Sequence, residues 1–428
     1  MPITAEEQYA IELINRARLD PAAEAARQKI ALNSGLAAGT ISDAVKQVLA
    51  PHNALDASAE GHAAWMLLKG VFSHTGANGS TPGDRMAAAG YSFTGSWGWG
   101  ENIALRTVSG MSLQKVIEAQ LNDLYASPTH RANLFGTDHR EIGLAQVVGS
   151  YLNYGQSSAL VENFAHRATV AYVTGVIYQD RNADDFYSIG EGVAGTALSL
   201  AGGARGTTAA AGGYALTAQA GAKVTLTIGT QASLIVDLAD GNVKVDLVSG
   251  NELHVSGDVD LLSGVGTVVA LGGGNLAISG HGGANRLVGN SGANQISGES
   301  GRDLLLGGAG ADLLQGGNGT DTLRGEAGND RLIGGEHADR LEGGAGADKF
   351  VFTRLSERDT VVDFDKAEGD RLQLDNVLWT GTLTTNQVVA RHTTLTDAGV
   401  EFDFGSGDVL VLAGVQSLTG LAGVIDLI

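Results

Sequence analysis

A nine-residue spacing of Asn and Asp side chains is the feature of this sequence that most restricts its fold. Two residues after each of these positions stands an apolar residue, so the two kinds of position keep a fixed phase. A strict period of this length predicts a β-solenoid. The polar positions are Asn285, Asn294, Asp303, Asp312, Asp321, Asp330, Asp339 and Asp348. Their apolar partners are Leu287, Ile296, Leu305, Leu314, Leu323, Leu332, Leu341 and Phe350.

Glycine-rich turns precede the acidic positions, as in Gly307-Gly308-Ala309-Gly310-Ala311-Asp312. Such turns need glycine where a Cβ is costly, and their carbonyls converge on one point. The pattern resembles the G-G-x-G-x-D-x-U-x repeat of the RTX family, which forms a calcium-binding parallel β-roll. The resemblance implies two repeats per coil, with calcium held between turns eighteen residues apart. It assigns metal ligation to Asp303, Asp312, Asp321, Asp330, Asp339 and Asp348.

The repeats are not equivalent. The pairs Asp303 with Asp321, Asp312 with Asp330 and Asp330 with Asp348 follow the family pattern. The Asp321 and Asp339 pair departs from it, because His337 stands where the family has glycine. The neutral side chains of Asn285 and Asn294 predict weaker binding in the first coils. An alternative is a metal-free solenoid in which the Asp side chains only cap turns.

Charge and composition agree with an ion-binding protein. The formal net charge is −20, which disfavours nucleic acid and anionic lipid but suits hard cations with oxygen ligands. The chain has no cysteine, so it has neither disulfides nor Cys-type zinc sites. No run of 18 apolar residues predicts a transmembrane segment, and the first residues lack the pattern of a signal peptide.

The N-terminal part has mixed helical and strand patterns. Thr4 and Glu7 form a predicted capping box before a helix. Further helices are predicted at 57–69, 82–89 and 113–125, followed by strands at 141–148, 159–163 and 170–178. This region is therefore predicted to be α+β.

Five ordered motifs of this region resemble the bacterial branch of the CAP superfamily, also called SCP-like, over residues 4 to 165. They include Phe72-Ser73-His74-Thr75-Gly76, Gly100-Glu101-Asn102-Ile103-Ala104 and Ser127-Pro128-Thr129-His130-Arg131-Ala132-Asn133, with further motifs at 58–63 and 79–85. The implied fold is an α-β-α sandwich. The family's cleft of two histidines and two acidic residues would place His74, Glu101 and His130 at three positions, and Ser127 falls near the fourth, which Asp123 could approach.

Two imidazoles and a carboxylate can bind Zn²⁺ or another divalent ion, act as general acid and base, or only lock loops by hydrogen bonds. All three readings of the cleft remain open. His62, in a helical run, is predicted to be a packed histidine, and Glu141 a part of the strand architecture. Trp97 and Trp99 either bind a lipid, sugar or peptide or form a local core.

A second calcium site is predicted in the segment after this domain. Its ligands occupy positions 1, 3, 5, 7, 9 and 12 of an EF-hand-like loop: Asp180, Asn182, Asp184, Phe186 through its carbonyl, Ser188 and Glu191. Asp185 stands at position 6, where glycine is usual. The surrounding run 173–193 resembles the SdrD B-like calcium-containing β-sandwich modules of bacterial surface proteins. A polar hairpin loop without metal is the alternative.

The C-terminal segment resembles the part that follows the β-roll in secreted RTX proteins, with Asp359-Thr360-Val361-Val362-Asp363-Phe364 and the acidic-apolar end Asp426-Leu427-Ile428. The resemblance implies export by type I secretion machinery, without an N-terminal signal peptide, to the extracellular space. A strand that caps the solenoid is a compatible reading of residues 400 to 428.

The sequence thus predicts a multidomain chain. Its parts are a CAP domain (1–167), a small β-sandwich with the EF-hand-like loop (168–238), a β-solenoid with the RTX β-roll (239–352, regular from 285) and a C-terminal cap with the secretion signal (353–428). The predicted function is a secreted calcium-binding protein whose CAP domain binds an extracellular lipid, sugar or peptide. Alternatives are a metal-dependent CAP hydrolase using His74, Glu101 and His130, and a structural cell-surface protein.

Overall fold

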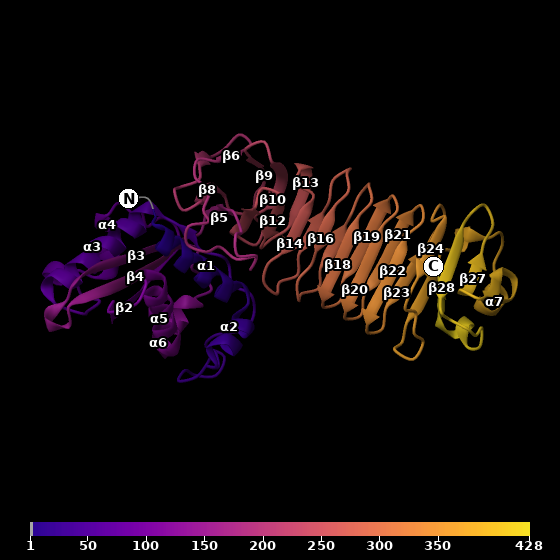
Figure 1. Cartoon of the computed structure of the whole chain (residues 1–428), viewed down its shortest axis with the longest axis horizontal. Coiled ribbons are helices and arrows are strands. Elements are labelled where there is room, and N and C mark those ends of the chain that lie inside the picture. The colour runs from indigo at the N-terminus through magenta and orange to yellow at the C-terminus, as the bar shows by residue number, and fades with distance from the viewer. Residues whose placement is uncertain (1–2) are drawn as a thin grey trace. The chain divides into compact units, whose positions relative to one another are not determined.

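The computed structural model describes residues 3–428, which divide into two compact units. The first comprises the chain up to Gln231 together with Val236–Gly250, and the second comprises Ala232–Ile235 together with Asn251–Ile428. Figure 1 labels their helices and strands. None of the helices within residues 3–428 is long and apolar enough to cross a membrane.

The first unit begins with the predicted capping box. Thr4 Oγ1 accepts a hydrogen bond from the Glu7 N–H at 3.2 Å, and Glu7 Oε2 accepts one from the Thr4 N–H at 2.8 Å. These bonds satisfy N–H groups that the first turn of a helix leaves free. The helices are α1 (Ala5–Leu19), α2 (Pro21–Gln28), α3 (Asn53–Lys69), α4 (Pro82–Ala88), α5 (Leu113–Ala126) and α6 (Pro128–Leu134), with short 3₁₀ turns η1 (Ala77–Gly79) and η2 (Leu152–Tyr154).

A four-stranded sheet in the order β1-β3-β4-β2 lies at the centre of this unit. Its strands are β1 (Ala50–Pro51), β2 (Trp97–Thr107), β3 (Glu141–Ser150) and β4 (Gln156–Arg167). Alternate residues of β4 face opposite sides: Val161 packs with Ala63 and Met66 of α3, whereas Leu160 packs with residues of α1 and α5. Helices therefore cover both faces, and the predicted α+β class and α-β-α arrangement are confirmed.

The remaining strands of the first unit pair in two groups of three, which belong to the two long sheets of the chain. One contains β8 (Gly213–Gln219), β5 (Val170–Tyr178) and β11 (Val243–Val248), in that order. The other contains β7 (Arg205–Thr207), β6 (Ala197–Leu200) and β9 (Lys223–Ile228). β10 (Ala232–Asp237) is divided between the two units.

Buried polar contacts join these strands to the α-β-α part. The Asn242 amide donates to the carbonyl of Val48 at 2.9 Å and to that of Arg140 at 2.7 Å. Lys244 Nζ lies 2.8 Å from Glu12 Oε2 and also pairs with Asp246. All three charged groups are at least 94% buried by side chain, so each charge is compensated inside the unit.

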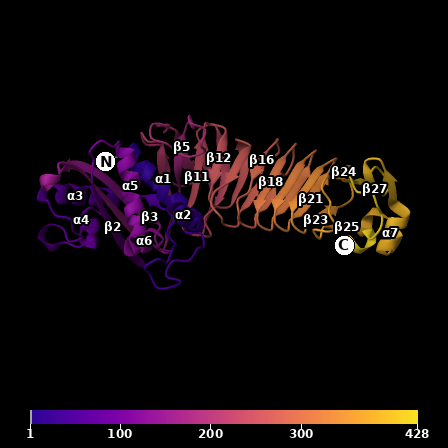
Figure 2. The same ribbon diagram turned by 60° about the horizontal axis from the view of Figure 1, so that its bottom comes forward.

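The second unit is a parallel β-solenoid whose successive strands alternate between two sheets (Figure 1, Figure 2). Residues eighteen apart pair in register, as Leu287 with Leu305 and Ile296 with Leu314. Two repeats therefore make one coil, as predicted. One sheet contains β13 (Val259–Gly264), β15 (Ala277–Ser279), β17 (Gln295–Ser297), β19 (Leu313–Asn318), β21 (Arg331–Glu336), β23 (Lys349–Phe352), β25 (Arg371–Leu374) and β29 (Ile425–Leu427).

The second sheet of the solenoid contains β12 (Glu252–Val255), β14 (Thr267–Ala270), β16 (Arg286–Val288), β18 (Leu304–Ala309), β20 (Thr322–Ala327), β22 (Arg340–Ala345), β24 (Arg358–Val361) and β28 (Val409–Ala413). The antiparallel strands β27 (Gly399–Asp403) and β26 (Thr393–Thr396) extend it. The C-terminal part also contains α7 (Thr385–His392) and the turns η3 (Asn376–Leu378) and η4 (Leu421–Val424). Each of the eight partner residues named above is at most 1% exposed, so one apolar side chain per repeat fills the interior.

Candidate calcium ladder and cleft

The repeat Asp side chains form two ladders along the solenoid, one for each turn of the coil. In each ladder, the N–H of one Asp donates to Oδ1 of the Asp eighteen residues later, as from Asp312 to Asp330 at 2.8 Å. The same bond joins Asp303 to Asp321, Asp321 to Asp339 and Asp330 to Asp348, each at 2.8 Å. Asp339 therefore takes its place in the ladder despite the His337 substitution.

The second carboxylate oxygen of each repeat Asp is left without a partner. Oδ2 is buried and has no hydrogen bond within residues 3–428 in Asp303, Asp312, Asp321, Asp330, Asp339 and Asp348. A Cβ at the glycine five residues earlier would collide with this oxygen, so these glycines keep the space beside it open. A glycine carbonyl of the next coil borders the same space, as Gly325 does beside Asp312. Buried carboxylate and carbonyl oxygens facing one space fit calcium.

Burial makes the charged form of these carboxylates unfavourable. It raises the pKa of Asp303, Asp330 and Asp348 to about 6 and that of Asp339 to about 7. Neighbouring Asp charges of the same ladder add to the effect, as Asp321 does for Asp339. A bound cation would supply the charge compensation that the protein does not.

The first coils differ in chemistry, as their Asn residues predicted. Asn285 Oδ1 accepts from the His281 N–H at 2.9 Å, and Asn294 Oδ1 accepts from the Leu276 N–H at 3.1 Å. An amide has one oxygen, and here it is already bonded. Weaker calcium binding at these turns remains a prediction.

The sequence reasoning missed two acidic residues at the end of the ladders. Asp359 Oδ1 accepts from the Asp339 N–H and Asp370 Oδ1 from the Asp348 N–H, both at 2.9 Å. Their spacing is 20 and 22 residues rather than eighteen, so a strict period does not find them. The available signal was the Asp-x-apolar pattern of Asp359-Thr360-Val361 and Asp370-Arg371-Leu372.

The CAP-like cleft brings His74, Glu101 and His130 together. His74 Nδ1 lies 2.8 Å from Glu101 Oε1, and the rings of His74 and His130 are 6.1 Å apart. The Glu101 side chain is 1% exposed, whereas that of His74 is 49% exposed. Burial and the neighbouring His74 lower the pKa of His130. The arrangement presents imidazoles to solvent above a buried carboxylate.

Arg85 is the residue of this cleft that the sequence reasoning missed. Its guanidinium pairs with Glu101 Oε2 and donates to the carbonyl of His74 at 2.9 Å. Both Glu101 oxygens are therefore engaged, one by His74 and one by Arg85. Within residues 3–428, no group of three or more His, Asp or Glu side chains is arranged to hold a metal. Zinc binding in the cleft, one of the readings that the sequence left open, is therefore not supported. The calcium ladder differs, because it offers single carboxylates that rely on backbone carbonyls.

Other polar residues of this region have packing roles. His62 is 2% exposed, and its Nε2 lies 2.8 Å from the Ser73 carbonyl oxygen. Asp123 forms a two-pronged ion pair with Arg106, at 2.6 and 2.7 Å. Glu141 is buried, and although burial alone would raise its pKa, hydrogen bonds from Arg167, Tyr172 and Tyr91 hold that pKa below its ordinary value.

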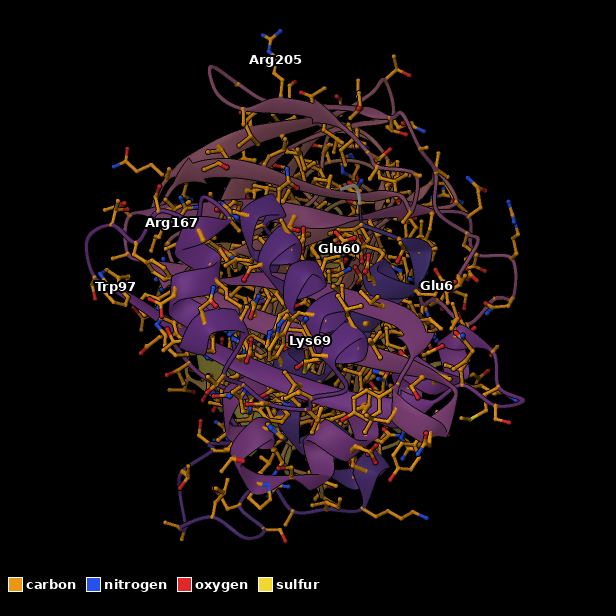
Figure 3. The ribbon with its side chains drawn as sticks, turned by 90° about the vertical axis from the view of Figure 1, so that its left-hand side faces the viewer. Glu6, Glu60, Lys69, Trp97, Arg167 and Arg205 are labelled. Atoms are coloured by element: carbon orange, nitrogen blue, oxygen red, sulfur yellow. The ribbon has the colours of Figure 1, made fainter. Side chains whose placement is uncertain are left out.

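Two tryptophans mark one margin of the sheet. Trp97 and Trp99 in β2 are 51% and 40% exposed, and Trp97 is the cross-strand neighbour of Arg167 in β4 (Figure 3). Trp97 also packs on Phe93, with ring centroids 4.9 Å apart. A large apolar surface therefore remains open to solvent on the strand that carries Glu101.

The EF-hand-like loop gathers the side chains predicted for it. The Asn182 amide donates to Asp184 Oδ2 at 3.0 Å and to Ser188 Oγ at 3.1 Å, and Glu191 Oε2 accepts from the Ser188 N–H at 2.8 Å. Asp185, at the position usually held by glycine, has a φ of 55°, the left-handed conformation required there. The Phe186 ring packs against Tyr9 and Arg16. Calcium ligation by this loop, and its SdrD B-like character, remain predictions.

Comparison with known families now defines the class of protein. A model of the cysteine-rich secretory protein family, CAP, matches residues 11–171, and a model of the RTX calcium-binding nonapeptide repeat matches residues 279–314 and 315–350. The chain contains a CAP domain followed by RTX calcium-binding repeats, so the predicted recognition of both is confirmed. It is therefore a calcium-binding protein with a β-roll.

A comparison with solved structures finds chains that are similar to parts of this one. An extracellular SCP-domain protein from Bacillus anthracis str. Ames is 26% identical over 28% of this chain and 35% of its own, with a TM-score of 0.22. An outer surface protein from Borrelia burgdorferi is 23% identical over 28% of this chain and 77% of its own, with a TM-score of 0.21. The extracellular lipase LipA from Serratia marcescens is 17% identical over 36% of this chain and 40% of its own, with a TM-score of 0.20. The chain thus spans about a third of the first of these proteins. A comparison with curated proteins finds no match.

Proposed function

We propose that this chain is a secreted protein whose β-roll folds on calcium after export and whose CAP domain binds an extracellular ligand. The observation that carries the calcium part is the row of buried, unpartnered Oδ2 atoms in Asp303, Asp312, Asp321, Asp330, Asp339 and Asp348. A buried carboxylate without a partner is costly, and calcium removes that cost in the folded form alone.

The calcium concentration controls this folding by mass action. A cation that binds only the folded state at a hundredfold excess over its dissociation constant stabilises that state by about 2.7 kcal/mol per site. Each repeat buries one apolar residue of nine, so packing alone gives the roll a small core against its chain entropy. Several sites acting together then decide whether the roll is folded. In a low-calcium cytosol the roll stays unfolded, a state suited to passage through a type I channel, and outside the cell it folds.

Circular dichroism of the full chain tests the calcium part, first in chelator and then in millimolar calcium. The double variant D312N/D330N should need more calcium for the same signal, because each change removes one unpartnered oxygen. D397N, on the exposed turn before β27, is the matched control and should titrate as wild type. Full β structure of the roll in chelator would contradict the proposal.

The secretion route has its own test. The acidic-apolar terminus Asp426-Leu427-Ile428 and the segment before it resemble a type I signal, so a chain truncated after residue 365 should stay in the cell. The D397N variant of the full chain should be exported normally. Appearance of the truncated chain in the medium through a type I channel would overturn this part.

A binding role for the CAP domain is supported by what surrounds its cleft. Glu101 is saturated by His74 and Arg85, while Trp97 and Trp99 remain exposed on the same strand. Exposed aromatic rings provide apolar contact area and stack on sugars, lipids or peptide side chains. Binding of sugar, lipid and peptide probes to wild type and to W97A tests this role. Weaker binding by a W97A variant that folds as wild type would support it, and unchanged binding would contradict it.

A hydrolase is the second candidate, because one observation favours it. The Nδ1 contact of His74 with the buried Glu101 is the arrangement in which a carboxylate orients an imidazole and leaves Nε2 for proton transfer. Hydrolysis of ester or peptide substrates that disappears in both H74A and E101A, with the fold retained, would promote this candidate. We expect no such activity.

A further inference from the structure

Asp359 lies outside the nine-residue repeat but repeats its geometry. It follows Asp348 by 11 residues, and the RTX match ends at residue 350. Strand β24 nevertheless pairs in parallel with β22, with Thr360 opposite Arg340 and Val361 opposite Leu341. This register sets Asp359 beside Asp339, just as Thr322 opposite Arg340 sets Asp321 beside Asp339 one coil earlier.

The Asp359 carboxylate has the same bonding as the repeat carboxylates. Oδ1 accepts from the Asp339 N–H at 2.9 Å, and Oδ2 is buried without a hydrogen-bond partner in residues 3–428. The residue as a whole is 0% exposed. The nearby Ser356 hydroxyl donates to the Gly335 carbonyl at 3.1 Å. An acidic oxygen without a hydrogen bond is thus held inside the end of the ladder.

The turn before Asp359 keeps a positive φ at two positions where the repeat has glycine, although it has no glycine there. In the repeat, Gly308 and Gly310 lie four and two residues before Asp312, with φ of 101° and 115°. Leu355 and Glu357 occupy these places before Asp359, with φ of 69° and 49°. Positive φ is unfavourable for residues with a Cβ, so the surrounding coil imposes this turn shape. The His337 N–H contributes by donating to the Leu355 carbonyl at 3.0 Å.

The other ladder ends differently and provides an internal comparison. Asp370 Oδ1 accepts from the Asp348 N–H, but its Oδ2 also accepts from the Asp365 N–H at 2.8 Å. Both oxygens are therefore satisfied by the backbone, and Asp370 is absent from the buried oxygens that lack a partner. One ladder stays open at its last Asp, and the other is closed.

We infer that Asp359 is a calcium ligand, and that a further calcium ion lies between the turns that end at Asp339 and Asp359, one coil beyond the last nine-residue repeat. This inference rests on the proposed calcium-dependent folding of the roll. Calcium accepts six to eight oxygen ligands with flexible geometry, which two stacked turns and two carboxylates can supply. No equivalent site exists at Asp370.

The electrostatics of the site agree with its geometry. Burial and the Asp339 carboxylate raise the pKa of Asp359 to about 9, outweighing the Asp339 N–H and Ser356, which lower it. The Asp408 carboxylate is a further negative neighbour. Because β24 also pairs with β28, an ion at Asp359 would fasten the last repeat coil to the C-terminal cap.

Calcium stoichiometry of the full chain tests the inference. After removal of calcium with chelator, wild type, D359N and D370N are titrated by equilibrium dialysis with metal analysis. D359N keeps Oδ1 to accept the Asp339 N–H, and it should bind one calcium ion fewer per chain than wild type. D370N, the matched variant of the closed ladder, should bind as many as wild type.

The possible outcomes separate the two proposals. Wild type that binds no calcium overturns the proposed function itself. Calcium binding by wild type with the same number of ions in D359N overturns the inference alone, as does an equal loss in D370N. If D359N does not fold, a crystal structure of calcium-loaded wild type decides: an ion between the turns that end at Asp339 and Asp359 supports the inference, and ions at the repeat turns with none at this place contradict it.

Discussion

The β-roll and the CAP domain handle buried charge in opposite ways. In the CAP domain, the buried carboxylates Glu101 and Glu141 meet cations of the protein, Arg85 and Arg167 respectively. In the roll, the six repeat carboxylates and Asp359 lie one after another along the ladders, and each keeps one oxygen without a partner. The first domain contains its own counter-charges, whereas the second depends on ions from solution. Two regions of one chain can therefore have stabilities that depend on different conditions, here the internal ion pairs of one and the calcium concentration around the other.

The largest effect expected from this difference follows calcium removal. Chelator should unfold the roll and leave the CAP domain folded, because the roll stacks its carboxylates in ladders without internal charge compensation. Hydrogen exchange resolved by peptide measures both regions at once: residues 303–350 should exchange rapidly in chelator, and β3 and β4 should stay protected. Equal loss of protection in the two regions would remove the distinction.

The converse perturbation is a broken ion pair in the CAP domain. R167A leaves Glu141 buried without its cation, and removing one partner of a buried pair costs on the order of 3–5 kcal/mol. Urea denaturation should register this loss for the first unit, while the calcium titration of the roll stays unchanged. R106A, at the exposed pair with Asp123, is the control and should cost about 1 kcal/mol or less. Similar losses in both variants would contradict this account.

Glu162 is a buried carboxyl group of the CAP domain that no cation of the described residues pairs with, and pH should reveal it. Burial raises its pKa to about 8, although a hydrogen bond from Asn102 lowers it. A carboxyl whose folded pKa lies above its unfolded value binds more protons when folded, so its contribution to stability is full below about pH 4.5 and is lost as pH rises toward 8.

The variant E162Q removes this titration. It should be more stable than wild type at pH 8 by about 1–3 kcal/mol, with a smaller difference at pH 5. Thermal unfolding of the first unit at both pH values measures the effect. An equal shift at pH 5 and pH 8 would show that Glu162 does not titrate between them.

The smallest effect concerns a single turn of the roll. His337 has a φ of 80°, where the family has glycine. H337G should stabilise the calcium-loaded roll by about 0.5–1 kcal/mol, because glycine accepts this conformation without strain. A338G, at a neighbouring residue without positive φ, should have no such benefit. Calcium-loaded unfolding in guanidinium distinguishes the two, and a loss of stability in H337G would refute the strain.

Much of the fold could be predicted because its signals are local. The capping box of Thr4 and Glu7, the strand at 170–178 and the eighteen-residue register all follow from spacing along the chain. The short helix α2 and the strand β2 were not predicted, because β2 carries glycines and tryptophans without a clear alternation. Of the cleft, the motifs predicted His74, Glu101 and His130 but not Arg85.

The sequence by itself determined that the chain has a glycine-turned calcium roll and a CAP domain, since a fixed period and ordered motifs are written along the chain. Only the tertiary structure decided which charges meet. Arg85 reaches Glu101 across 16 residues, Lys244 meets Glu12 from a distant strand, and Asp359 enters the ladder after a longer loop. The physical reason is that strand register and packing select partners in space. A loop can lengthen by two residues without disturbing that register. A search for a fixed spacing along the chain then no longer finds the paired residue.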